Sequence, residues 1–192
     1  MDDHDLDERL ARDLDGTFEA LVRAHQDRLF SIALRLTGDA HDAEETVQDT
    51  FVRAYRALGG YEPGRIRDLH LRPWLARIVI NLRRNRARRR GDRPLALAPL
   101  VAVGAEPAAD PAAGPEAATG RRAETERWAG LLLGLPARYR VPVVLRHVDD
   151  LSYAEMAEAL GRAEGTLKAQ VHRGLALLRA AYDAAERKEL SA

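Results

Sequence analysis

The spacing of hydrophobic residues predicts three amphipathic helices in the first half of the chain. Apolar side chains recur every three or four residues through 16–36, 40–58 and 74–90, which is the period of one face of an α-helix. His25 lies on the apolar stripe of the first helix, where a core histidine fits better than a metal ligand because no second histidine lies one turn away. We expect the three helices to close one small all-α domain.

Glycine, aspartate and proline mark the ends of these helices. Gly38 suits the left-handed conformation that follows a helix, and Asp39 can cap the start of the next one. Gly59 begins a glycine pair that ends the second helix. Residues 61–72 are then expected to form a loop, and Pro73 suits the first position of the third helix.

A second helical domain is predicted over residues 121–186. Ser152 and Glu155 have the spacing of a capping box at the start of a short helix, and Gly161 is expected to turn the chain. The last helix is expected to run over 164–185. Two helices joined by a short turn that contains glycine form the pattern of a helix-turn-helix, although a helical hairpin packed only for structure has the same pattern.

The segment between the two predicted domains has a different composition. Residues 94–120 are rich in alanine and include five prolines and three glycines, which leaves little to build a core from and predicts a flexible linker. Residues 1–15 are rich in aspartate and predict a disordered acidic lead-in, and residues 187–192 are expected to be a tail. The expected fold is therefore all-α, with domains at 16–93 and 121–186.

Composition excludes several classes of protein. The chain has 192 residues and no cysteine, so disulfides, thiolate metal sites and cysteine catalysis are all excluded. No apolar run approaches the roughly 18 residues that a membrane span needs. The first residues are acidic and do not have the pattern of a signal peptide. These features predict a cytoplasmic protein without membrane insertion.

Charge is unevenly distributed although the formal net charge is +0. Residues 1–58 contain 14 acidic and 7 basic side chains, whereas residues 59–93 contain 3 and 11. The basic side chains concentrate in the helix predicted at 74–90, whose other face is apolar. Such a surface suits a polyanion, although a solvated basic helix end is the alternative.

Polar side chains that suit DNA are also gathered near the start of the last helix. Lys168, Gln170 and Arg173 can donate hydrogen bonds to phosphates and base edges, and their place near a helix N-terminus suits the major groove. The two clusters of residues that suit contacts with DNA lie in different predicted domains. A linker between them would let the domains contact two places on one large target.

Taken together, these motifs resemble a known family. RLTGDAHDAEETVQDTFVRAYRAL and WLARIVINLRRNRARRR are similar to region 2 of bacterial RNA polymerase sigma factors of the extracytoplasmic-function (ECF) type. LPARYRVPVVLRHVDDLSYAEMAEALGRAEGTLKAQVHRGLALLR is similar to region 4 of the same family. The chain departs from the family pattern at Thr46, where a large aliphatic residue is common, at Asn85, where aspartate is common, and in the length of the loop before Trp74.

The resemblance implies a sigma factor that binds core RNA polymerase and melts promoter DNA without being an enzyme. The residues that it assigns to core polymerase binding are Asp42, Glu45, Gln48 and Asp49. Those that it assigns to the minus-10 element are Tyr61, Trp74, Arg77, Asn81, Arg83, Arg84 and Arg88. Those that it assigns to the minus-35 element, on the recognition helix and its turn, are Arg162, Thr166, Lys168, Ala169, Gln170, His172 and Arg173. The loop at 61–72 would capture a flipped base, and no cofactor or metal is implied.

Control by a third protein is a further expectation. The sequence offers no sensor domain, no cysteine to oxidise and no cluster of metal ligands through which a signal could act. We therefore expect an anti-sigma factor that covers the core-binding face, the DNA-binding surfaces or both.

Two other functional classes compete with this interpretation. A helical metal-dependent nucleotide pyrophosphatase would use Glu44, Glu45, Gln48 and Asp49 as half of a metal site, but the helix at 74–90 supplies no further carboxylate. A helix-turn-helix regulator that acts without polymerase is the second alternative, and it leaves the first domain unexplained.

Overall fold

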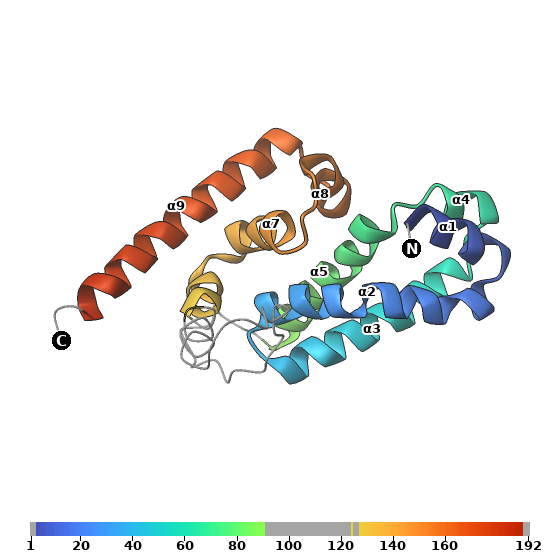
Figure 1. The fold of residues 1–192 in the computed structure, drawn as a ribbon, viewed down its shortest axis with the longest axis horizontal. Coiled ribbons are helices and arrows are strands. Elements are labelled where there is room, and N and C mark those ends of the chain that lie inside the picture. The colour runs from blue at the N-terminus through green and yellow to red at the C-terminus, as the bar shows by residue number, and fades with distance from the viewer. Residues whose placement is uncertain (1–2, 91–123, 125–126, 190–192) are drawn as a thin grey trace, which may run out of the picture.

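Every regular element that the computed structural model describes, within residues 3–90, 124 and 127–189, is a helix. The helices form two groups, one before residue 91 and one after residue 126, which Figure 1 shows packed against each other. The predicted all-α fold class is confirmed. The predicted linker at 94–120 lies outside the described residues, as do the last three residues of the predicted tail.

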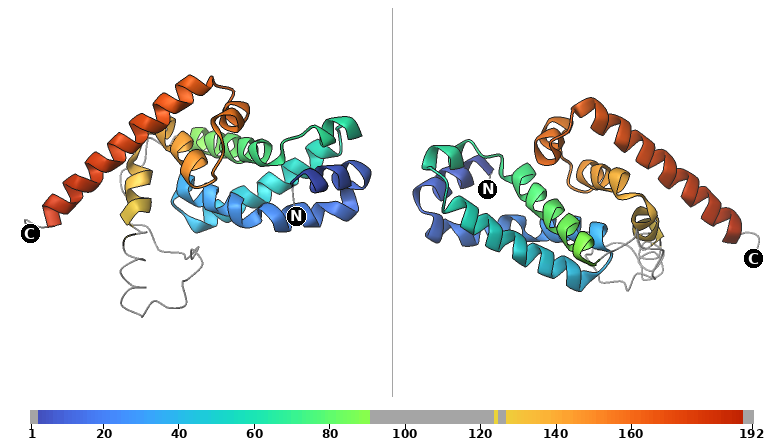
Figure 2. Two further views of the ribbon diagram at one scale, coloured as in Figure 1. Left: turned by 45° about the horizontal axis from the view of Figure 1, so that its top comes forward. Right: turned by 180° about the vertical axis from the view of Figure 1, so that it is seen from behind.

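Three long helices form the first group: α2 (Leu14–Thr37), α3 (Ala40–Leu58) and α5 (Leu71–Arg90). They pack against one another pairwise (Figures 1 and 2). Their apolar stripes meet in a core of side chains that are at most 3% exposed: Leu21, Leu29, Ile32, Ala33, Leu36, Ala43, Ala54, Leu58, Leu75, Ala76, Val79 and Leu82. His25 is buried among them, as its place on the apolar stripe predicts.

The turn between α2 and α3 has the predicted caps. Gly38 has a φ of 78° and its N–H donates to the carbonyl of Leu34, as expected for a left-handed residue that ends a helix. The Asp39 side chain accepts a hydrogen bond of 2.8 Å from the backbone N–H of Asp42. A Cβ on Gly38 would also lie 2.6 Å from Cδ1 of Leu133, so this turn lies directly beneath the second group of helices.

The expectation of a disordered lead-in at 1–15 is wrong. Residues Asp3–Arg12 form helix α1, and α2 already begins at Leu14. Leu6 and Leu10 are each 1% exposed, and α1 packs against α2 and α4. Aspartates dominate the composition of this segment, and one of them, Asp7, is itself buried. Two leucines four residues apart are enough to bury one side of a short helix.

The expected loop at 61–72 is also partly helical. It contains helix α4 (Pro63–Arg67), with Pro63 at its first position and Ile66 buried against the bundle. Helix α5 then begins at Leu71, so Pro73 is its third residue instead of its first. A proline in the first turn of a helix removes no internal hydrogen bond, so the helix can start earlier than the proline alone suggests.

The second group contains a helical stretch at 127–134 and helices α7 (Ala137–His147), α8 (Tyr153–Leu160) and α9 (Glu164–Glu189). Both hydrogen bonds of the predicted capping box are present at Ser152 and Glu155. Gly161 turns the chain with a φ of 62°. The helix-turn-helix is thus formed by α8 and α9. Helix α9 reaches Glu189, beyond the predicted end and into the segment expected to be a tail.

The two groups of helices pack directly against each other. α8 lies against α5, and α7 lies against α2 (Figure 2). The chain between α7 and α8 therefore enters the junction between the groups, close to the start of α5. This contact brings side chains from the two predicted domains within hydrogen-bonding distance, as described below.

Candidate nucleic-acid and protein interfaces

Helix α5 has two faces of opposite character. Leu75, Val79 and Leu82 point into the bundle and are at most 3% exposed. The opposite face is polar. It carries four of the residues predicted to bind the minus-10 element, of which Asn81 is partly covered and three are exposed: Arg77, Arg84 and Arg88. These four positions follow one another at four-, three- and four-residue spacing, so they form a single stripe along the helix.

Arg83 lies apart from that stripe. Its Nε donates a hydrogen bond of 3.1 Å to the carbonyl of Leu36, at the end of α2. The last carbonyls of a helix carry partial negative charge and need donors, so an arginine fits there well. Sequence reasoning grouped Arg83 with the DNA-binding arginines, whereas the structure gives it a contact that joins two helices.

An aromatic pair lies beside the start of α5. The rings of Tyr61 and Trp74 have their centroids 6.3 Å apart, and the guanidinium of Arg65 lies 3.8 Å from the centre of the Tyr61 ring. Both aromatic side chains are half-buried, so part of each ring is open to solvent. Rings of this kind can stack on unpaired bases, and an arginine beside them can hold a phosphate.

The residues predicted to read the minus-35 element lie together at the start of α9 and in the turn before it. Of the seven, only Gln170 is partly covered, and its side chain accepts a hydrogen bond of 3.1 Å from Arg162. Lys168 lies 3.6 Å from Glu164 in an exposed ion pair. An exposed pair of this kind contributes little, so Lys168 can exchange it for a phosphate.

The residues predicted to bind core polymerase lie along one side of α3. Gln48 and Asp49 are exposed, and Asp42 and Glu45 are partly covered. Glu45 and Asp49 both contact Arg86 of α5: Nη1 lies 3.1 Å from Oε2 of Glu45, and Nη2 lies 2.8 Å from Oδ2 of Asp49. The acidic pair is therefore already engaged by an arginine from the neighbouring helix, a contact that sequence reasoning missed.

The same side of α3 continues into an apolar notch. Val52 is 49% exposed and Tyr55 is 42% exposed, which is unusual for large side chains of this type. The notch is lined by Phe18, Phe51, Val52, Tyr55 and Arg56. Its aromatic rings pack edge to face, with the centroids of Phe18 and Tyr55 5.0 Å apart. An acidic patch thus borders an exposed apolar one.

Comparison with known proteins identifies the family. The family model for Sigma-70 region 2 matches residues 21–93, and the model for Sigma-70, region 4 matches residues 126–178. The ECF RNA polymerase sigma factor SigW of Bacillus subtilis is 30% identical over 167 residues, which cover 84% of this chain and 87% of SigW. The chain belongs to the ECF family of RNA polymerase sigma factors. This sigma factor is a transcription initiation factor and not an enzyme, which removes the pyrophosphatase alternative.

Two further similarities agree with this assignment. The ECF RNA polymerase sigma factor SigE of Mycolicibacterium smegmatis is 36% identical over 163 residues, which cover 85% of this chain and 60% of SigE. A solved structure of CnrH in complex with the cytosolic domain of CnrY matches with a TM-score of 0.69 and 27% identity, covering 95% of this chain and 97% of CnrH. The similarity in structure thus extends over both groups of helices.

A buried charged contact lies between the two groups of helices of this sigma factor. Nη1 of Arg28 on α2 lies 2.8 Å and 3.0 Å from the two carboxylate oxygens of Asp149, and Nη2 lies 2.9 Å from the carbonyl of Arg72. Arg72 in turn donates to the carbonyl of Asp149. Burial raises the pKa of Asp149 to about 6, although Arg28 and Arg72 pull it in the opposite direction. Neither Arg28 nor Asp149 was predicted from the sequence to have a functional role, whereas Arg72 is the last residue of the predicted base-capture loop.

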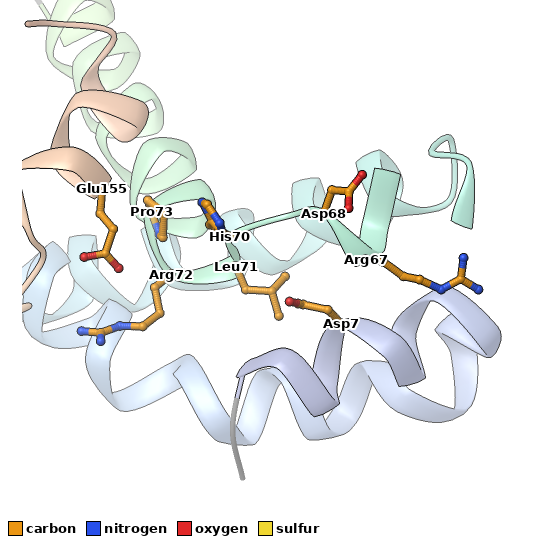
Figure 3. A pocket seen from close by; sticks show the side chains of 8 residues that line it. All are labelled: Asp7, Arg67, Asp68, His70, Leu71, Arg72, Pro73 and Glu155. Carbon is orange, nitrogen blue, oxygen red and sulfur yellow. The ribbon is translucent and has the colours of Figure 1, made fainter. Parts of the chain in front are cut away.

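A cleft opens beside this contact. It has a volume of about 560 Å³ and lies where α1, α4 and the start of α5 meet α8 (Figure 3). His70 lies at its edge, with Nδ1 2.8 Å from a carboxylate oxygen of Glu158. The cleft is lined by Asp7, Arg67, Asp68, His70, Leu71, Arg72, Pro73 and Glu155. Residues of the predicted base-capture loop therefore line one side of this cleft, and α8 forms another side.

The described residues contain no group of three or more potential metal ligands. None of the helices that the structure describes combines the length and apolar character needed to cross a bilayer.

Proposed function

We propose that this sigma factor docks on core RNA polymerase through the side of α3 that carries Asp42, Glu45, Gln48 and Asp49. The support is the pairing of two kinds of surface, because the acidic residues border the exposed Val52 and Tyr55. A protein interface typically has an apolar centre with a polar rim. The acidic rim would steer the protein toward a basic surface on the polymerase, and the apolar notch would supply the buried contact.

In the same proposal, α5 binds the minus-10 element. The stripe of Arg77, Asn81, Arg84 and Arg88 would hold phosphates on one face of the helix. Tyr61 and Trp74 lie at the start of α5, where they can stack on a base that has left the duplex. Extruding a base costs a few kcal/mol, and contacts made only with the open strand offset this cost. Promoter melting then requires no chemistry by the sigma factor itself.

The start of α9 would read the minus-35 element. Its side chains are exposed on the second helix of a helix-turn-helix, which is the element that enters the major groove in this motif. One observation carries the whole proposal. The two sets of side chains that suit contacts with DNA, on α5 and on α9, lie in the two regions that match the sigma-70 family. Such a protein would work where the polymerase is, in the cytoplasm.

Transcription in vitro tests this proposal. The full chain would be added to core polymerase with a pooled promoter library, and binding of the same DNA would be measured with and without core enzyme. We expect transcription from a subset of promoters, and DNA binding that depends on core polymerase. Tight, sequence-specific binding without polymerase would instead support a helix-turn-helix regulator that acts alone.

We also propose that an anti-sigma factor restrains this chain. The support is the similar structure of CnrH, which was solved in complex with the cytosolic domain of CnrY. A third protein that covered the acidic side of α3 would block core binding without any sensor in this chain. Capture of the tagged protein from uninduced cells tests this: recovery with one inhibitory partner would support the proposal, and recovery bound only to core polymerase would refute it.

A further inference from the structure

Arg86 lies on a different face of α5 from Arg77, Arg84 and Arg88. It follows Leu75, Val79 and Leu82 at four-, three- and four-residue spacing, so it continues the stripe that faces the bundle. The proposed DNA stripe, which includes Arg84 and Arg88, is on the other side of the helix. An arginine at the end of an apolar stripe reaches across its neighbours and carries its charge toward the adjacent helix.

The neighbouring helix meets that charge with two carboxylates. Arg86 contacts Glu45 at 3.1 Å and Asp49 at 2.8 Å with its two terminal nitrogens, and Nη1 also lies 3.5 Å from the hydroxyl of Thr46. The Arg86 side chain is 26% exposed, whereas those of Glu45 and Asp49 are 45% and 51% exposed. The arginine is therefore the more enclosed partner, and the carboxylates remain within reach of another molecule.

This contact changes the charge that α3 presents. Glu45 and Asp49 are one helical turn apart and repel each other, and Arg86 relieves that repulsion. Two carboxylates shared with one guanidinium carry a net charge of about −1. A basic partner would therefore meet a less acidic surface than the sequence of α3 suggests, and it would have to compete with Arg86 for the same oxygens.

The contact also holds the end of α5. Arg86 ties this part of the helix to α3. Arg83 ties it to α2 through the carbonyl of Leu36. Without the contact to α3, the last turns of α5 would keep their helical hydrogen bonds but lose a lateral support. The orientation of the arginines beyond it would then be less fixed.

We propose that Arg86 is a positioning residue that masks the acidic pair. It holds the end of α5 on α3, and it must yield Glu45 and Asp49 when a basic surface docks there. Docking on α3 and the placement of the DNA-binding helix are thereby linked through one side chain. This inference rests on the proposed function, because it takes the docking surface to be that of core polymerase.

The rate of association with core polymerase tests the masking. The full chain, labelled at a cysteine introduced by Ala176→Cys on α9, would be mixed with core enzyme in a stopped-flow instrument at several salt concentrations. We expect Arg86→Gln to associate roughly two- to fivefold faster at low salt, with a steeper dependence on salt, because the acidic surface gains a net negative charge. A residue that was only structural would slow association or leave it unchanged.

Arg23→Gln is the matched control. It removes the same charge from an exposed position on α2 that belongs to none of the proposed binding surfaces, so association with core should equal that of the parent chain. Hydrogen exchange provides a second measurement: amides at 83–88 should lose protection in Arg86→Gln and keep it in Arg23→Gln. Arg86→Lys keeps the charge but not the two-pronged contact, and it should lie between the parent chain and Arg86→Gln in both measurements.

The outcomes separate this inference from the proposed function. If the parent chain does not associate with core polymerase, the proposed function fails. If the parent chain associates and Arg86→Gln is no faster, the masking role of Arg86 is wrong although the proposed function stands. If Arg86→Gln loses helicity, Arg86→Lys decides: association no faster than that of the parent chain overturns the inference.

Discussion

Arg28 and Asp149 are 121 positions apart in the sequence and form an ion pair between the two groups of helices, in which one guanidinium nitrogen contacts both carboxylate oxygens. The Asp149 side chain is 0% exposed and that of Arg28 is 18% exposed. Water is therefore largely excluded from the pair, so loss of one partner leaves an uncompensated buried charge and costs more than at a surface ion pair. It fixes how the helix-turn-helix packs on the first bundle.

Arg28→Gln should separate the two groups of helices. The substitution leaves a buried carboxylate with Arg72 as its remaining cationic partner, and breaking a buried pair in this way costs about 3 to 5 kcal/mol. Energy transfer between dyes on cysteines introduced by Arg53→Cys and Ala176→Cys would report the separation, since the chain has no native cysteine. Arg23→Gln, on the exposed side of the same helix, is the control. An unchanged transfer efficiency in Arg28→Gln would contradict the prediction.

The contact between the two groups should tighten as the pH falls from 8 toward 5. The raised pKa of Asp149, about 6 against an ordinary value of 3.8, means that the packed state holds a proton that the separated state releases. Packing is therefore favoured progressively as pH falls from about 6 to about 4. The hydrogen bond and charge of Glu158 raise the pKa of His70, so its contribution is present below its ordinary pKa of 6.5 and is lost as pH rises through the raised value.

Two variants assign this pH dependence. Asp149→Asn should flatten the lower part of the energy-transfer curve, and His70→Gln should flatten the part above about pH 6.5. Glu155 also faces the cleft, and burial tends to raise its pKa. Hydrogen bonds from Ser152 outweigh that effect, so the pKa of Glu155 is lowered from its ordinary value. A curve that does not change in either variant would show that other groups control the contact.

The parts of this fold that follow local rules could be predicted from the sequence. Asp39, Ser152 and Gly161 act through residues within one turn of themselves, so their roles can be read from spacing alone. The pairing of Arg28 with Asp149 depends on how two separate groups of helices meet, which no local pattern records. The position of Arg86 on α5 could be predicted only in part. The spacing of the apolar residues places Arg86 on the face that packs against the bundle, whereas an arginine is usually expected on an exposed face.

Helix α1 shows a different reason for failure. Its composition is that of a solvated segment, and only Leu6 and Leu10 indicate burial. We expect Leu10→Ala to lower the free energy of unfolding by about 2 to 5 kcal/mol, as for other fully buried leucines. Thermal or urea unfolding followed by circular dichroism measures this, with Ala11→Gly as a comparison for the loss of helix propensity alone. Substitutions on a protein surface usually change the free energy of unfolding by no more than about 0.5 kcal/mol. A change of this small size in Leu10→Ala would show that α1 is dispensable for stability.

Lys168→Ala and Arg173→Ala should weaken binding of the holoenzyme to a minus-35 duplex. A bidentate contact to a base is worth about 1 to 3 kcal/mol and depends on the sequence of the DNA. A contact to phosphate weakens binding to all sequences alike and lowers the slope of affinity against salt by about one. Measuring both variants on matched and scrambled duplexes at several salt concentrations separates the two roles. Arg179→Ala, farther along the same helix, is the control, and no effect of either substitution on DNA would remove α9 as the reading helix.

Neutralising the acidic pair should weaken the docking of this sigma factor on core polymerase. Glu45→Gln with Asp49→Asn keeps the shape of both side chains, whereas reversal to arginine would also place like charges beside Arg86 and disturb α5. The neutral variant isolates the electrostatic contribution, which acts mainly on the association rate and diminishes at high salt.

Glu19→Gln with Asp27→Asn removes the same charge from the exposed side of α2 and serves as the control. We expect core association to slow several-fold at low salt in the first variant only, because charges at the contact dominate steering. Equal slowing in both would mean that net charge, and not this face of α3, guides the encounter.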